Sequence, residues 1–88
     1  MSTISVLCEN IRRARLRQGL TQEIIAEKAG LSTRHFQDLE TGRRPGMRVE
    51  TIERIADVLR VEVWQLFKEG IFPEPEVQRG RSTKKIRR

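Results

Sequence analysis

The sequence predicts an all-α protein: a compact bundle of five helices in residues 1–70, followed by a Pro-containing basic tail in residues 71–88. Three observations support this fold class. Apolar residues recur every three or four positions over most of the first 70 residues, which is the spacing of one helix face. Glycines and good helix N-caps separate these stretches. With 88 residues, the chain is long enough for a single domain.

The first two helices are expected on either side of Gly19. Apolar side chains at helical spacing predict the first helix from Ile4 to Gln18, and Gly19 ends it. Thr21 is a suitable N-cap for the second helix, and Glu23 in its first turn complements the helix dipole. The buried side of this second helix is expected to hold Ile24, Ile25, Ala26 and Ala29.

Glycine, serine and proline delimit the helices that follow. Only Leu31 separates Gly30 from Ser32, which is the next N-cap, so the second and third helices must cross at a steep angle. The third helix is expected from Thr33 to Thr41, closed by Gly42. The remaining elements are a loop at residues 43–46, a fourth helix at residues 49–60 and a short fifth helix at residues 63–68.

Composition argues against several classes of protein. No apolar run reaches the roughly 20 residues of a membrane helix, and the first residues lack the basic and apolar segments of a signal peptide. We therefore expect a cytoplasmic protein with no membrane partner. A single cysteine, Cys8, and a single histidine, His35, are too few for a tetrahedral metal site. We therefore expect neither a bound metal nor a cofactor. We also expect no enzymatic activity, because Cys8 and His35 fall on different helices without a third partner.

Positive charge is concentrated at the C-terminal end. The net charge is +6, and the last 18 residues hold six basic and two acidic residues. A basic chain attracts polyanions such as nucleic acids. The tail therefore either adds non-specific affinity for DNA, by releasing counterions from phosphates, or serves solubility alone.

The outer face of the third helix is the strongest candidate for a functional surface. A steep crossing needs a small side chain at Ala26, and Phe36 and Leu39 then seat the third helix on the domain. Seated in this way, the helix turns a polar face to solvent, made of Thr33, Arg34, Gln37 and Asp38, with His35 near its edge. Such donors and acceptors are the kind that read base edges in the major groove of double-stranded DNA.

With these residues in place, the chain resembles the Cro/C1-type, or Xre-like, helix-turn-helix regulators. The resemblance covers Ile11 to Phe67, about two thirds of the chain. It rests on a series of motifs at the family's spacing: Ile11-Arg12-Arg13-Ala14-Arg15, Gly19-Leu20-Thr21-Gln22, Ala26-Glu27-Lys28-Ala29-Gly30-Leu31-Ser32, Leu39-Glu40-Thr41-Gly42-Arg43-Arg44-Pro45, Ile55-Ala56-Asp57-Val58-Leu59 and Leu66-Phe67.

The resemblance implies a lambda-repressor-like fold in which the second and third helices form the DNA-reading unit. Carried over residue by residue, Gln22 touches a phosphate and braces the recognition helix, while Thr33 and Arg34 read bases. Arg15 and Glu40 match a structural pair that ties the first helix to the end of the third. The complete set of expected DNA contacts is Gln22, Ser32, Thr33, Arg34, His35, Gln37, Asp38, Arg43, Arg44 and Arg48.

The fifth helix and the residues after it hold more apolar surface than such a domain needs. Val63, Leu66 and Phe67 are expected in the core, whereas a patch of Trp64, Ile71 and Phe72 is expected to form a homodimer interface. A dimer places two recognition helices one DNA turn apart, about 34 Å, as a palindromic site requires. The alternative is that Ile71 and Phe72 fold back to cap the core of a single chain.

These observations favour a sequence-specific transcriptional regulator, a repressor that binds a palindromic operator as a homodimer. Repression needs only occupancy of the operator, whereas activation needs a polymerase-facing surface that the sequence does not identify. One alternative is an antitoxin, in which a toxin protein docks on the same DNA-binding fold. Another is a protein- or RNA-interaction module that does not read DNA.

Overall fold

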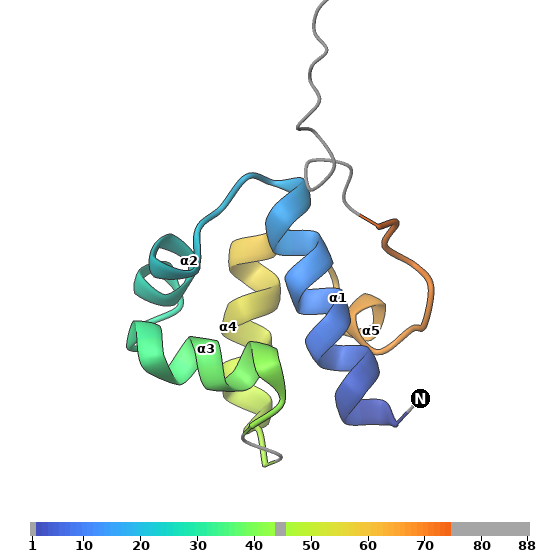
Figure 1. The fold of residues 1–88 in the computed structure, drawn as a ribbon, viewed down its shortest axis with the longest axis horizontal. Helices are drawn as coiled ribbons and strands as arrows, with labels where there is room; N and C mark the ends of the chain where they lie inside the picture. The colour runs from blue at the N-terminus through green and yellow to red at the C-terminus, as the bar shows by residue number, and fades with distance from the viewer. Residues whose placement is uncertain (1, 44–45, 75–88) are drawn as a thin grey trace, which may run out of the picture.

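Five helices make up the fold, as expected (Figure 1). The computed structural model describes residues 2–43 and 46–74. Figure 1 shows α4 at the centre of the molecule, with α2 to its left, α3 running from the left across its lower half, and α1 and α5 to its right. Across the described residues, none of the helices has the length and apolar character needed to cross a membrane. In chain order, the helices are α1 (Thr3–Arg17), α2 (Gln22–Lys28), α3 (Thr33–Thr41), α4 (Val49–Leu59) and α5 (Val63–Leu66).

The first three helices begin at hydroxyl N-caps. In each case the hydroxyl of the cap accepts a backbone N–H from the first turn, which would otherwise have no partner within the helix. The second and third of these caps are those that the sequence predicts. The three bonds run from Ser5 N–H to Ser2 Oγ (3.1 Å), from Ile24 N–H to Thr21 Oγ1 (3.0 Å) and from His35 N–H to Ser32 Oγ (3.0 Å).

The sharp turn between α2 and α3 depends on Gly30. Its φ is +75°, in the left-handed region that residues with a Cβ rarely adopt. The next residue, Leu31, donates its N–H to the carbonyl of Ala26 at 2.8 Å, which satisfies a carbonyl at the end of α2. Ala26 is buried where the two helices meet. The expected break in the helix is therefore confirmed, and α3 starts in a new direction.

All five helices contribute to one hydrophobic core. Its largest fully buried side chains are Leu7 and Ile11 of α1, Ile25 of α2, Phe36 and Leu39 of α3, Ile55 and Leu59 of α4, and Leu66 of α5. Phe36 and Leu39 are thus buried as expected, and their burial holds the inner side of α3 against the rest of the domain. The opposite side of α3 is consequently left to solvent.

Two residues expected in the core are exposed, so the prediction was wrong for Ile24 and Phe67, whose exposed fractions are both 40%. Consecutive helical residues point about 100° apart, so a short helix that buries Ile25 turns Ile24 away from the core. Phe67 comes after the last residue of α5, because this helix is shorter than expected and ends at Leu66. Phe67 is instead the C-cap residue of this helix.

The segment after α5 packs against α1. Phe72 is only 6% exposed and belongs to the core, and Ile71 is half-buried against it. Arg13 Nη1 donates to the carbonyl of Phe72 at 3.0 Å, and Arg13 Nη2 lies 2.7 Å from Glu74 Oε1. The expectation that Phe72 lies in an exposed patch is therefore wrong, and the packed part of the chain extends past residue 70. Most of the expected basic tail, residues 75–88, lies outside the described residues.

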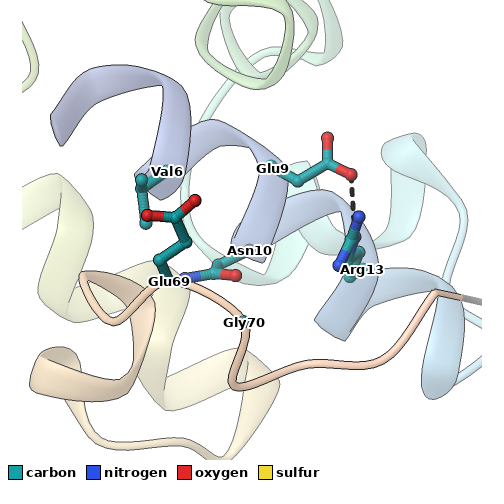
Figure 2. Close-up of a pocket in the computed structure, with 6 residues that line it drawn as sticks. All are labelled: Val6, Glu9, Asn10, Arg13, Glu69 and Gly70. Atoms are coloured by element: carbon teal, nitrogen blue, oxygen red, sulfur yellow. Dashed lines mark hydrogen bonds and ion pairs between the residues drawn. The ribbon is translucent and has the colours of Figure 1, made fainter. Parts of the chain in front are cut away.

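Asn10, a buried residue of α1, lies beside the segment that follows α5 (Figure 2). Asn10 Nδ2 donates to the carbonyls of Leu66 and Lys68, both at 2.9 Å. These groups come at the end of a helix and have no helical partner of their own. Asn10 also lies beside a small hollow of about 170 Å³, which is lined by Val6, Glu9, Asn10, Arg13, Glu69 and Gly70.

Glu9 organises the arginines that hold this segment. Its Oε2 accepts from Arg12 Nη2 at 3.1 Å and from Arg13 Nε at 2.7 Å. The hydrogen bond from Arg12, helped by Arg13, lowers the pKa of Glu9 although partial burial acts the other way. The same two arginines reach Glu74, so residues 71–74 are tied to α1 by charge as well as by the buried ring of Phe72.

Candidate nucleic-acid interface

The start of α3 presents the residues expected to read bases. Arg34 lies in the first turn, and its side chain is 79% exposed, so the guanidinium is free to enter a groove. Thr33 is half-buried beside it, and Ser32 is exposed but uses its hydroxyl as the N-cap. A continuous helix from residue 22 to 39, or a buried Arg34, would have excluded a helix-turn-helix. In this stretch the helix is instead broken between α2 and α3, and Arg34 is exposed.

One open hollow of about 440 Å³ gathers five of the ten expected contacts. It is lined by Gln22, Arg34, Gln37, Asp38, Thr41 and Arg43. Arg34 Nε lies 3.6 Å from Asp38 Oδ1, an i,i+4 pair that leaves the arginine exposed. The hollow thus brings donors and acceptors from the start of α2, along α3 and beyond its end to one surface. Thr41 was not among the predicted residues, although its position four residues after Gln37 places it on the same helix face.

Behind this surface, Arg15 and Glu40 form the buried pair that the resemblance implied. Arg15 Nε lies 2.7 Å from Glu40 Oε2, and Arg15 Nη2 lies 3.2 Å from Glu40 Oε1, so the pair is bidentate. Arg15 Nη1 also donates to the carbonyl of Leu20 at 2.8 Å. The Glu40 side chain is only 4% exposed. Breaking such a buried pair leaves one charge without compensation, so the pair holds α1 and α3 in a fixed relation.

Gln22, the first residue of α2, joins this helix to two residues of the recognition helix. Its Nε2 donates to Glu40 Oε1 at 2.6 Å, and its Oε1 accepts from Gln37 Nε2 at 3.2 Å. Gln22 therefore braces α3, as the resemblance implied. No signal in the sequence indicated that Gln37 would be its partner on α3.

His35 and Arg48 lie around a different hollow, of about 150 Å³, between α3 and the start of α4. This second hollow is lined by His35, Leu39, Gly46, Met47, Arg48 and Thr51. Arg48 is the N-cap of α4 and is exposed. His35 and Arg48 are therefore separate from the five that line the larger hollow, and Ser32 and Thr33 line neither of the two. Arg44, also expected to touch DNA, lies outside the described residues.

The surroundings of Cys8 indicate a structural role. It is buried, and its Sγ donates to the carbonyl of Leu39 at 3.0 Å, which joins α1 to α3. Burial raises the pKa of the thiol, and the negative charge of Glu40 acts in the same direction. A protonated, buried thiol is a poor nucleophile. In residues 2–43 and 46–74, the side chains that bind metals do not form any cluster of three or more.

Comparison with solved structures shows the same fold in three proteins. The N-terminal DNA-binding domain of SinR from Bacillus subtilis has a TM-score of 0.69 at 24% identity, and the match covers 75% of this chain and 96% of that one. A point mutant of the restriction-modification controller protein C.Esp1396I also has a TM-score of 0.69, at 27% identity, with 76% and 86% covered. The hypothetical transcription factor NHTF from Neisseria has the same TM-score at 28% identity, with 93% and 85% covered.

No sequence among the curated proteins matches the chain. A family model described as a helix-turn-helix domain, however, matches residues 7–64, which run from the middle of α1 into α5. This match spans more than half of the chain and includes both α2 and α3. Together with the solved structures, it confirms the resemblance to the Cro/C1-type regulators. The chain therefore belongs to the helix-turn-helix domain family.

Proposed function

We propose that the protein is a sequence-specific DNA-binding transcriptional regulator that carries out no chemistry of its own. The observation that carries this proposal is the polar outer face of α3, seated by the buried Phe36 and Leu39 and presenting the exposed Arg34. In a helix-turn-helix, the second helix of the motif, here α3, enters the major groove with its first residues at the base edges. The similar structures support this role, since one is the DNA-binding domain of SinR and another is the restriction-modification controller protein C.Esp1396I.

Each charged group that lines the hollow suits one kind of DNA contact. The guanidinium of Arg34 can donate two parallel hydrogen bonds to guanine O6 and N7. The carboxylate of Asp38 would repel a phosphate but can accept from the amino group of cytosine. Arg43, just beyond the end of α3, is exposed and suits a phosphate. The same role is proposed for Arg44 and Arg48. Thr33 is proposed to read bases together with Arg34, and His35 lies near the edge of this face.

Selection of bound duplexes from a random oligonucleotide pool tests the proposal directly. We expect the pool to converge on one sequence, and footprinting to show protection of that sequence at protein concentrations that leave random DNA unprotected. A pool that stays random after repeated rounds, or equal affinity for single-stranded RNA of the same length, would refute sequence-specific DNA binding.

Replacing Arg43 with alanine is expected to weaken binding to the selected duplex and to random duplex by the same factor. A phosphate contact carries no sequence information, so both affinities fall together. The plot of log affinity against log salt concentration should become less steep by about one for each bound chain, because one fewer counterion is released. Titrations of both duplexes at several salt concentrations measure this. An unchanged salt dependence would remove Arg43 from the phosphate contacts.

We further propose that the protein represses by occupying a palindromic operator as a homodimer. Trp64 of α5 is 59% exposed, and Phe67, one turn later, is 40% exposed. Large apolar side chains gathered at a surface are typical of a partner interface. With Phe72 in the core, the proposed interface consists of Trp64, Phe67 and the half-buried Ile71.

The change of Trp64 to aspartate is expected to shift the sedimenting species from dimer to monomer, because a charge would have to be desolvated in the interface. Sedimentation velocity at matched concentrations measures this shift. Val49→Asp is the matched control, since Val49 is 65% exposed and lies in the first turn of α4, where a negative charge suits the helix dipole. A Trp64→Asp chain that sediments as the wild type does would exclude this surface as the interface.

A further inference from the structure

Gln37 donates a hydrogen bond to Gln22, and Gln22 donates one to Glu40, so this series runs from Gln37 to Glu40. Glu40 stands at one end of the series, and its buried carboxylate accepts from Arg15 and from Gln22. A carboxylate accepts hydrogen bonds, whereas a guanidinium only donates them. Arg15 therefore keeps Glu40 as the acceptor of the series, and the amide of Gln22 has no choice of orientation: its nitrogen must face the carboxylate.

The orientation of Gln22 fixes the orientation of Gln37 in turn. With Nε2 turned toward Glu40, Gln22 offers its oxygen to α3, and a donor must meet it there. Gln37 Nε2 meets it at 3.2 Å. The two ends of a glutamine amide differ in chemistry, because the oxygen only accepts and the nitrogen only donates. Gln37 is therefore left with its Oε1 and one N–H for other partners, in the hollow that it lines with Arg34 and Asp38.

We propose that Gln37 is a specificity-determining residue that reads adenine, and that Glu40 is the positioning residue that sets this preference through Gln22. This inference rests on the proposed DNA-binding function. In the major groove, adenine offers one donor (N6) and one acceptor (N7), the pattern that complements one amide oxygen and one N–H. Guanine offers two acceptors (O6 and N7), and the fixed oxygen of Gln37 would face one of them. A glutamine without this restraint could turn its nitrogen outward and accommodate guanine.

The variant Glu40→Gln is expected to reverse the series. Arg15 still requires an acceptor, so the amide oxygen at position 40 turns to Arg15 and the amide nitrogen turns to Gln22. Gln22 must then offer its oxygen to residue 40 and its nitrogen to Gln37, which turns its own nitrogen outward. At one operator position, preference is expected to move from adenine toward guanine by roughly tenfold, within the range for a two-bond base contact.

Gln22→Met provides a second variant that keeps the buried ion pair of Arg15 and Glu40. It removes the link to Gln37, so preference for adenine over guanine should fall to near one at the same position without reversing. Gln37→Met identifies that position, because it removes the reading group itself. Glu53→Gln, on the exposed face of α4, is the matched control for the loss of one negative charge and should leave all base preferences unchanged.

The experiment measures affinities of the full chain and its four variants for duplexes that carry each of the four base pairs at every position of the selected site. Thermal melts of each variant show that it is folded. The inference is supported if Gln37→Met and Gln22→Met flatten the same position and Glu40→Gln shifts it toward guanine. It is overturned if Gln37→Met changes no position, or if the folded Glu40→Gln and Gln22→Met chains keep the wild-type preference at the position that Gln37→Met flattens. Failure of the wild-type chain to select any sequence would instead refute the proposed function.

Discussion

Replacing Arg34 with alanine is expected to lower affinity for the selected operator by tenfold or more while leaving affinity for random duplex almost unchanged. A guanidinium that bonds two acceptors of guanine is worth roughly 1–3 kcal/mol of discrimination against other bases. In a homodimer the loss occurs in both half-sites, so the effect on the whole operator is larger than in one site. Arg34 is suited to this role because its side chain is 79% exposed and its ion pair with Asp38, at 3.6 Å, is open to solvent.

Lys68→Ala is the matched control for this prediction. Lys68 is exposed and follows α5, which Figure 1 shows on the other side of the molecule from α3. The control removes the same charge and should change both affinities little. Titration of operator and random duplex with both variants separates the effects. Equal loss on both duplexes would mean that Arg34 contacts phosphate, and no loss on either would place the reading face elsewhere.

The helix-turn-helix could be predicted from sequence because its signals are local. Ser32 caps α3 through the N–H of His35, three residues away, and Gly42 closes it with φ of +80°. Gly30 follows Ala26 by only four residues. Each of these effects acts over a few residues, so residue type and spacing were enough to determine the bounds of α3 and the side of it that is buried.

The amide series behind α3 could not be predicted in the same way. Gln22 and Gln37 are separated by 15 residues and Gln22 and Glu40 by 18, and their contact depends on the angle at which α2 and α3 cross. The resemblance supplied the pair of Arg15 and Glu40 and the bracing role of Gln22. Which residue of α3 Gln22 contacts, and in which orientation, depends on the three-dimensional packing of the two helices.

The path of the chain after α5 was also undetermined by sequence. Ile71 and Phe72 form an apolar pair after a glycine, and such a pair suits either an exposed interface or the edge of the core. The deciding contact joins Arg13 to the carbonyl of Phe72, 59 residues later in the chain. Gly70, at φ +79°, allows the turn that directs this segment back along α1. The turn itself has a local signal, but its direction depends on the packed helices.

Phe72→Ala is consequently expected to lower the free energy of unfolding by about 3 kcal/mol, the lower end of the range for removing a buried phenylalanine. In a domain of this size, such a loss lowers the melting temperature by more than about 10 °C. A chain that ends at residue 70 should lose at least as much, because it also lacks the bonds from Arg12 and Arg13 to Glu74. Urea denaturation at a fixed protein concentration measures both.

Phe67→Ala is the matched control for Phe72→Ala, with the same atoms removed five residues earlier from a ring that is 40% exposed. Its cost is expected to be nearer 1 kcal/mol, since less apolar surface returns to water and no enclosed cavity is left. The two losses in free energy of unfolding are compared with each other. Dimerisation through Trp64 and Phe67 would raise the loss for Phe67→Ala but not the loss for Phe72→Ala. Equal, small losses for both at a concentration where the chain is monomeric would show that residues 71–74 are not part of the core.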